Sequence, residues 1–361
     1  GFNEKRSTKP DRTVLLQIDL SKAFDMVNHD KLIKDLDESP LPSSLKRWFS
    51  CYLRGRQSRV NFRNHLSKCR NVRAGVPQGA VTSPILFNFY LRNLPRPPDN
   101  VQVIQYADDI SIYATGKPIH GLTNAINFYI PSVLNFLEER ELKVSPTKST
   151  VTLFTPDTKE ARIQPEVKMY GDIVPFEPNP KLLGVTFDTM YTFAKHIKIS
   201  TDKAKTKVNM MKALAGSTWG QDLEILSMTY KSIGRSVLEY ATPIWSPLIS
   251  STSWTKLQTI QNQALRIITG NVGMASQQHL HRETKIMPIK EHCNMISKQF
   301  LLTNHLSSHP GFKHTTFHPE ILNQQFKITD KILITFSLSH LKMTLKLKLR
   351  SFTPLKLANQ F

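Results

Sequence analysis

Two aliphatic runs in the first third of the chain are separated by only three residues. Residues 101–106 and 110–114 are short and rich in β-branched or aromatic side chains, and the sequence between them is Ala107-Asp108-Asp109. A connection this short joins neighbouring antiparallel strands, so the pattern predicts a hairpin with two carboxylates at its tip. Because Asp is also a common turn residue, this pair alone does not establish chemistry.

A third acidic residue follows an earlier strand. Residues 12–18 form a run of mainly Val, Leu and Ile that ends at Asp19. If this strand lies beside the hairpin in an antiparallel sheet, Asp19, Asp108 and Asp109 converge at one end. Carboxylates are the hard oxygen ligands that Mg²⁺ prefers, and nucleotidyl transfer to a 3′ end uses two such cations. An Asp after a strand can also be a helix cap; for Asp25 we expect a cap or a salt bridge.

A glycine-containing loop, residues 75–84, precedes an apolar helix. Its glycines permit close backbone approach, and Gln78, next to Gly79, can hydrogen-bond a base or a sugar. A simple helix-entry loop is the alternative. Phe24, five residues after Asp19, could stack below an incoming sugar and exclude a 2′-hydroxyl, although a core aromatic would look the same.

The remaining pattern predicts an α+β fold with a helical second part. Expected helices cover 21–36, 45–53, 85–94 and 122–141, and further strands cover 57–62, 151–154 and 181–187. Prolines punctuate a connector between 156 and 180. Beyond 193 the periodicity is helical, with one apolar face on Leu257, Ile260, Ala264, Leu265 and Ile268. Residues 331–350 fit an edge strand, an amphipathic helix or a disordered basic tail.

The charge of the chain points to a polyanionic partner. It carries 48 Lys and Arg against 28 Asp and Glu, a formal charge of +20, which a polyanion-binding surface explains better than a neutral small-molecule substrate does. The excess is net +14 in residues 181–361 against +6 before them, and no acidic residue occurs from 39 to 98. A solvated basic face and phosphate contact explain that stretch equally well.

The cysteine and terminal patterns bound the cellular setting. Three scattered cysteines indicate neither a disulfide framework nor a Cys-rich zinc site, and no apolar run is long enough to span a bilayer. We therefore expect an intracellular protein without a membrane partner. The chain begins at Gly1, which we interpret as a fragment of a longer polyprotein.

Several separated motifs together resemble the reverse transcriptases of non-long-terminal-repeat retrotransposons, especially the jockey-like elements. Residues 19–25 (Asp-Leu-Ser-Lys-Ala-Phe-Asp) with 27–32 resemble motif A, 75–84 resemble motif B, and Tyr-Ala-Asp-Asp at 106–109 matches motif C. Weaker similarities follow in the family's order over about residues 1–305: motif D at 142–148, motif E at 182–185, and the helical thumb at 239–245 and 257–270.

The resemblance implies a polymerase palm followed by a helical thumb, and an RNA-directed DNA polymerase activity. Residues 1–190 would form the palm with partial fingers, 191–305 the thumb-like domain, and 306–361 a basic extension. It implies that two Mg²⁺ ions, with Mn²⁺ as a substitute, bind Asp19, Asp108 and Asp109. Phe24, Gln78, Gly79 and Tyr106 would contact the nucleotide, and Lys148 would protonate pyrophosphate, unless it is simply a solvated surface Lys. The implied partners are an RNA template, a DNA primer and deoxynucleoside triphosphates, in the nucleus and cytoplasm.

Alternatives to this interpretation remain. The family's upstream fingers motifs and its endonuclease would precede Gly1, so the chain could instead be a truncated, non-catalytic nucleic-acid-binding remnant. A viral RNA-templated RNA polymerase usually has Gly-Asp-Asp at the hairpin and lacks the Pro-Gln-Gly loop. Group II intron maturases and telomerase share more of the pattern, but the similarity at 239–270 separates them from this chain.

Overall fold

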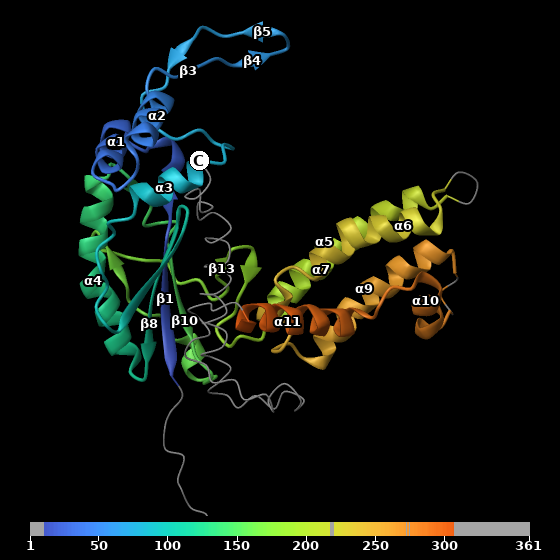
Figure 1. Ribbon diagram of the computed structural model, residues 1–361. Coiled ribbons are helices and arrows are strands. Elements are labelled where there is room, and N and C mark those ends of the chain that lie inside the picture. The colour runs from blue at the N-terminus through green and yellow to red at the C-terminus, as the bar shows by residue number, and fades with distance from the viewer. Residues whose placement is uncertain (1–10, 217–219, 272, 274, 307–361) are drawn as a thin grey trace, which may run out of the picture. The chain divides into compact units, whose positions relative to one another are not determined.

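The computed structural model describes residues 11–216, 220–271, 273 and 275–306, which belong to two compact units (Figure 1). The division lies between Pro178 and Asn179, in the proline-punctuated connector. Residues 331–350, for which the sequence left three conformations open, lie outside the described residues, as does almost all of the 306–361 extension. The two units are described separately below.

The first unit is built on a four-stranded antiparallel sheet. Its strands are β1 (Arg12–Ile18), β7 (Val101–Tyr106), β8 (Asp109–Gly116) and β10 (Thr150–Phe154), in the order β10-β1-β8-β7. The register pairs Ile18 with Ile110 and Tyr106 with Asp109. This arrangement confirms the predicted α+β class and the predicted hairpin.

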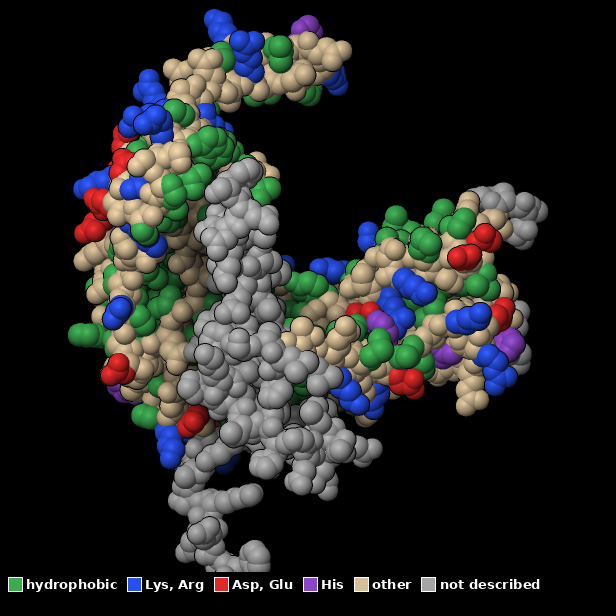
Figure 2. Space-filling model, in the orientation of Figure 1, with side chains coloured by type: hydrophobic (Ala, Val, Ile, Leu, Met, Phe, Trp, Pro, Cys, Tyr) green, Lys and Arg blue, Asp and Glu red, His purple; other side chains and the backbone are tan. Residues whose placement is uncertain are grey.

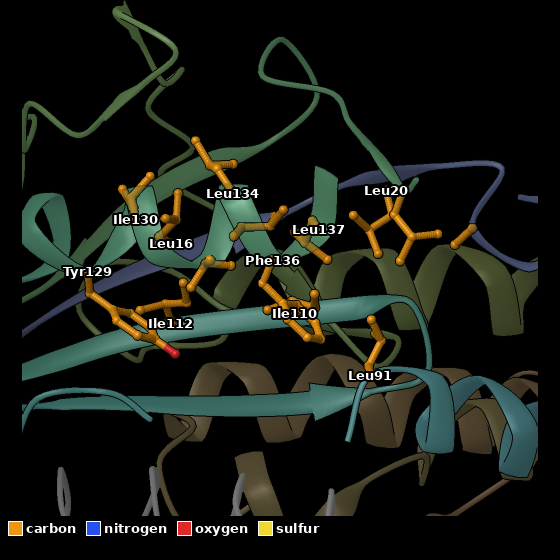
Figure 3. Packing of buried hydrophobic residues seen from close by; sticks show 14 of the residues in the cluster. Leu16, Leu20, Leu91, Ile110, Ile112, Tyr129, Ile130, Leu134, Phe136 and Leu137 are labelled. Carbon is orange, nitrogen blue, oxygen red and sulfur yellow. The ribbon is translucent and has the colours of Figure 1, made fainter. Parts of the chain in front are cut away.

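Helix α4 (Ile119–Glu139) packs on β1 and β8 and covers one face of this sheet (Figure 1). Alternate strand residues such as Leu16 and Ile112 are fully buried there, beside Ile130 and Leu137 of the helix (Figure 3). Burying each such side chain contributes about 1.5–3 kcal/mol. Because side chains alternate between the two faces of a strand, Ile18 and Ile110 point to the core, and the adjoining Asp19 and Asp109 point to the other face.

The expected helix over 21–36 is wrong in its first half. The chain forms β2 (Leu20–Ser21), paired with β9 (Lys143–Val144), then a 3₁₀ turn η1 (Ala23–Asp25), and only then α1 (His29–Asp37). Asn28 begins α1 because its side-chain oxygen accepts a hydrogen bond from the Lys31 N–H at 3.1 Å. The backbone before it bonds to the 75–76 segment instead of continuing a helix.

Helix α2 (Ser43–Leu53) confirms the helix predicted at 45–53, and α3 (Ser83–Tyr90) begins and ends earlier than predicted. The single strand expected over 57–62 is wrong. Two short ladders form there, β3 (Gln57–Ser58) with β6 (Arg70–Asn71) and β4 (Asn61–Phe62) with β5 (His65–Leu66). The unit also contains η2 (Glu160–Arg162) and the strand pair β11 (Lys168–Met169) and β12 (Asp172–Ile173).

The second unit is a short strand pair followed by helices. The strands are β13 (Lys181–Leu182) and β14 (Val185–Thr186), so the continuous strand expected over 181–187 is a tight hairpin. The helical elements are α5 (Ala194–Leu214), α6 (Leu223–Thr229), the π-helical η3 (Tyr230–Arg235), α7 (Ser236–Leu238), α8 (Thr242–Trp245), α9 (Ser251–Thr269), α10 (Gln277–Thr284) and α11 (Ile289–Leu306). The apolar face predicted on α9 is buried against its neighbours, which include α5, α10 and α11.

The 239–245 segment fastens the β13–β14 hairpin to the helices. The Tyr240 hydroxyl donates to the carbonyl oxygen of Leu183 at 2.7 Å, and the Trp245 indole N–H donates to the Tyr240 carbonyl at 2.8 Å. Gly184, in the left-handed region at φ +87°, leaves room for the Tyr240 ring, which a Cβ would approach to 3.2 Å.

Within the described residues, no helix combines the length and apolar character needed to cross a bilayer.

Candidate active site

The turn between β7 and β8 presents two aspartates at one end of the sheet. Tyr106 and Asp109 form the last pair of the ladder, so Ala107 and Asp108 make a two-residue turn. Ala107 has φ +53°, the left-handed conformation common at the first position of such hairpin turns. Asp108 and Asp109 are both exposed.

Asp19 lies at the same end of the sheet. Because Ile18 pairs with Ile110, the continued register sets Asp19 opposite Asp109, on the face turned away from the core. The backbone of Asp19 is fixed by the 145–149 turn: its N–H donates to Ser149 Oγ at 3.1 Å, and its carbonyl accepts from the Ser145 N–H at 2.9 Å. The predicted convergence of the three acids at one sheet end therefore holds for the strand register.

The three carboxylates also interact electrostatically. The pKa of Asp109 is raised above its ordinary value, first by desolvation and then by the negative charges of Asp108 and Asp19. Three like charges at one sheet end favour a bound cation, and their hard oxygen atoms suit a divalent one. In the part of the chain that the structure describes, no three His, Cys, Asp or Glu side chains are grouped closely enough to form a finished metal site.

Main-chain contacts hold the 75–84 loop against the segment that follows Asp19. The Gly75 N–H donates to the Val27 carbonyl and the Val76 N–H to the Phe24 carbonyl, both at 2.8 Å. Gly75 has φ +86°, and a Cβ there would lie 2.9 Å from the Cα and carbonyl oxygen of Asp25. Only glycine fits this position without a shift of the backbone. The loop is thereby fixed beside the sheet end.

Gln78 and Gly79 lie on the exposed part of this loop. The Gln78 side-chain amide donates to Asp25 Oδ1 at 2.9 Å. No atom lies within 4 Å of a Cβ built on Gly79, which leaves its backbone open to a ligand. The expected cap or salt bridge of Asp25 is wrong: it ends η1, it forms no ion pair among the described residues, and its partner is Gln78.

The other predicted residues occupy different environments. Phe24 is partly buried and stacks on Phe87, with ring centroids 4.8 Å apart, so its ring is packed as a core aromatic, while its carbonyl accepts from the Val76 N–H of the loop. Tyr106 is half-buried at the end of β7. Lys148 is exposed in the 145–149 turn, where its N–H donates to the Ser145 carbonyl.

The sequence did not predict that Ser145 and Ser149 hold the backbone of Asp19. Ser149 is buried, accepts from the Asp19 N–H, and donates to the Ser145 carbonyl at 2.8 Å. The sequence Ser-Pro-Thr-Lys-Ser at 145–149 predicts a turn stabilised by hydroxyl groups, but it gives no sign that Asp19 is the partner.

A cavity of about 980 Å³ beside α4, lined by Asn127, Pro131 and Tyr170 among others, includes none of the candidate site residues.

Comparison with known proteins gives consistent matches. The sequence model of the reverse transcriptase (RNA-dependent DNA polymerase) family matches residues 1–187. The probable RNA-directed DNA polymerase from transposon BS of Drosophila melanogaster is 28% identical over 284 residues, covering 76% of this chain and 31% of that protein. The probable RNA-directed DNA polymerase from transposon X-element of the same species is 28% identical over 289 residues. The match covers 79% of this chain and 31% of that protein.

A third relative is the RNA-directed DNA polymerase from mobile element jockey of Drosophila melanogaster, 24% identical over 301 residues, 81% of this chain and 32% of that protein. The chain thus spans about a third of the length of these relatives. Among solved structures, apo telomerase from Candida tropicalis aligns with 11% identity and a TM-score of 0.37 over 84% of this chain and 53% of that one, too loosely to support an argument.

Proposed function

The chain belongs to the reverse transcriptase (RNA-dependent DNA polymerase) family, and from that membership we propose that it carries the polymerase site of a non-long-terminal-repeat retrotransposon. The three Drosophila relatives confirm the predicted similarity to such elements, jockey among them. The observation that supports the proposal is the strand register, which pairs Ile18 with Ile110 and Tyr106 with Asp109, so that the chain reaches Asp19, Asp108 and Asp109 at one end of the sheet.

The proposed reaction joins a deoxynucleoside triphosphate to the 3′ end of a DNA primer on an RNA template. Enzymes of this family use divalent metal ions. Asp19, Asp108 and Asp109 would hold two Mg²⁺ ions, with Mn²⁺ as a substitute. When bound, the ions would activate the primer hydroxyl and stabilise the leaving pyrophosphate. Lys148 would donate a proton to the pyrophosphate. Gln78, Gly79 and Tyr106 would orient the nucleotide.

The two domains predicted from the sequence would divide this work. We assign residues 1–190 to the palm with partial fingers and residues 191–305 to a thumb-like domain that grips the primer–template, although the two compact units divide earlier, between Pro178 and Asn179. The parent element's protein would act in the nucleus and the cytoplasm. The positive charge of the chain favours the phosphate-rich substrate that this assignment requires.

Primer extension with the purified chain tests the proposal. We expect a DNA primer annealed to an RNA template to be extended in Mg²⁺, and extension to cease when EDTA removes the metal. Binding of the hybrid should survive metal removal, because it depends mainly on basic side chains. Hybrid binding without extension in either Mg²⁺ or Mn²⁺ would instead support a non-catalytic remnant.

Phe24 gives a prediction about sugar selection. Replacing Phe24 with Val removes a ring that would lie below the sugar, so we expect the preference for deoxyribonucleotides over ribonucleotides to fall by roughly 10- to 100-fold, as a change of pocket size does elsewhere. The measurement is kcat/KM for each nucleotide in single-nucleotide extension.

The matched control is Phe87→Leu, which removes the stacking partner of Phe24 but leaves its ring. It should lower the free energy of unfolding while preserving the preference. Equal loss of preference in the two variants would show that Phe24 acts only through packing.

A further inference from the structure

A two-stranded arm projects from the first unit (Figure 1). This arm, residues 57–71, consists of the β3–β6 and β4–β5 ladders, and its tip turns through Arg63 and Asn64 at φ 48° and 65°. Every residue in it is exposed. A two-stranded ribbon of this kind has no hydrophobic core of its own. Packing within the protein therefore does not explain why its side chains are large and apolar or positively charged.

Hydrogen bonds give the arm a defined shape. The Gln57 side-chain amide donates to Asn71 Oδ1 at 3.1 Å across its base, and Cys69 Sγ donates to Gln57 Oε1 at 3.0 Å. Between the ladders the Val60 N–H donates to Ser67 Oγ at 2.9 Å. Here two residues of one strand face three of the other, which is a β-bulge.

The arm is positively charged without neutralising partners. It carries Arg59, Arg63, Lys68 and Arg70, and the sequence contains no acidic residue from 39 to 98. Among the described residues, none of these four side chains forms an ion pair. Figure 2 shows Lys and Arg along the arm and no Asp or Glu. Such a surface is complementary to phosphate.

Large apolar side chains accompany these charges. Phe62 is 67% exposed, Val60 68% and Leu66 63%. Val60 immediately precedes β4, in which Phe62 pairs with His65. The Arg63 guanidinium lies 5.3 Å from the centre of the Phe62 ring. An aromatic ring flanked by cations offers a stacking surface for a base and contacts for the adjoining phosphates.

We propose that the arm binds an unpaired nucleic-acid strand, with a base stacked on Phe62 and phosphates on Arg59, Arg63 and Arg70. A duplex fits less well because its bases are already stacked and their faces hidden. This contact is separate from the three aspartates and does not depend on the proposed polymerase activity.

Fluorescence anisotropy of labelled oligonucleotides with the full chain tests the proposal. The probes are an unstructured RNA, a DNA of the same sequence and the corresponding duplex, all in EDTA so that catalysis plays no part. We expect Phe62→Ala to weaken binding of both single strands about tenfold and to affect the duplex less. The control is Phe128→Ala, since Phe128 is 80% exposed on α4 of the same unit.

The charged residues give an independent measurement. Arg59→Gln, Arg63→Gln and Arg70→Gln combined should reduce the slope of log K against log salt by about 2, because each phosphate that a protein neutralises on a single strand adds roughly 0.7 to that slope. The control is the triple variant Lys34→Gln, Arg162→Gln and Lys168→Gln, which removes the same number of positive charges from exposed positions of the same unit outside the arm. Unchanged affinity in Phe62→Ala, or an equal effect of the two triple variants, would overturn the proposal.

A protein partner for the arm is a different outcome of the same set of variants. If Phe62→Ala alters the sedimentation of the chain but not its affinity for either single strand, the apolar face mediates protein association and the proposal fails. Because the substitutions are at exposed positions, unchanged helical circular dichroism confirms that each variant is folded.

Discussion

Replacing Asp108 with Asn should lower the rate of primer extension by about three orders of magnitude. Asn keeps the size of the side chain and suits a turn, so the β7–β8 hairpin should form as before. The substitution removes one negative charge from the three carboxylates that we propose hold the metal ions. Charge stabilisation by such ions is worth several kcal/mol, and each 1.36 kcal/mol corresponds to a factor of ten in rate.

Asp19→Asn and Asp109→Asn should have effects of similar size, because the strand register brings the three residues to one end of the sheet and we propose that all three hold the metal ions. The matched control is Asp37→Asn, an exposed residue at the end of α1, which should leave the rate within a factor of two of the original. Single-turnover extension on a pre-bound hybrid measures the step directly. Near-normal extension by Asp108→Asn would refute the assignment of the site, and hybrid binding measured in parallel separates loss of chemistry from loss of substrate.

Replacing Glu239 with Ala should lower the free energy of unfolding of the second unit by about 3–5 kcal/mol. Glu239 Oε1 accepts from Arg235 Nε and faces His292 Nδ1, each at 2.6 Å. The Arg235 side chain is only 7% exposed, so the variant leaves a buried cation without its carboxylate. Amide hydrogen exchange in η3, α7 and α11 would measure the loss in the affected unit.

The control for Glu239 is Glu283→Ala, which removes the exposed His279–Glu283 pair on α10. Exposed pairs are worth about 0–1 kcal/mol, so this variant should be nearly neutral. Joint replacement of Arg235 by Met and Glu239 by Leu should recover much of the stability lost in Glu239→Ala, since no unpaired charge remains. If Glu239→Ala is no more destabilising than Glu283→Ala, the buried pair does not stabilise the unit.

Features that depend on local chemistry could be predicted from the sequence. The period of two and the three-residue connection gave the hairpin, and the same period brought Asp19 to the sheet end that holds Asp109. The helical period likewise gave the buried face of α9. These patterns are set by neighbouring residues and by burial of one face, which a sequence displays directly.

Features that depend on distant contacts could not be predicted. The first half of the expected 21–36 helix is lost because its carbonyl groups at Phe24 and Val27 accept from residues about 50 positions later. The hydrogen bond of Gln78 to Asp25 and the contact of Glu239 with His292, 53 positions away, have no local signal either. The similarity at 239–245 marked that segment as important without showing that it fastens a hairpin.

The attachment of the 75–84 loop has a consequence for how the protein tolerates sequence change. Two of its hydrogen bonds, from the Gly75 and Val76 N–H groups to the Val27 and Phe24 carbonyls, join peptide groups, so substitutions at Phe24, Val27 or Val76 need not break them. Two others depend on side chains: His29 Nε2 lies 2.7 Å from the Gly75 carbonyl oxygen, and the Gln78 amide donates to Asp25 Oδ1. The requirement is concentrated at Gly75, where any side chain meets the backbone of Asp25. The main-chain part of the attachment therefore tolerates most substitutions but requires glycine at residue 75, so that the sequence around the loop can change while this glycine preserves the close backbone approach.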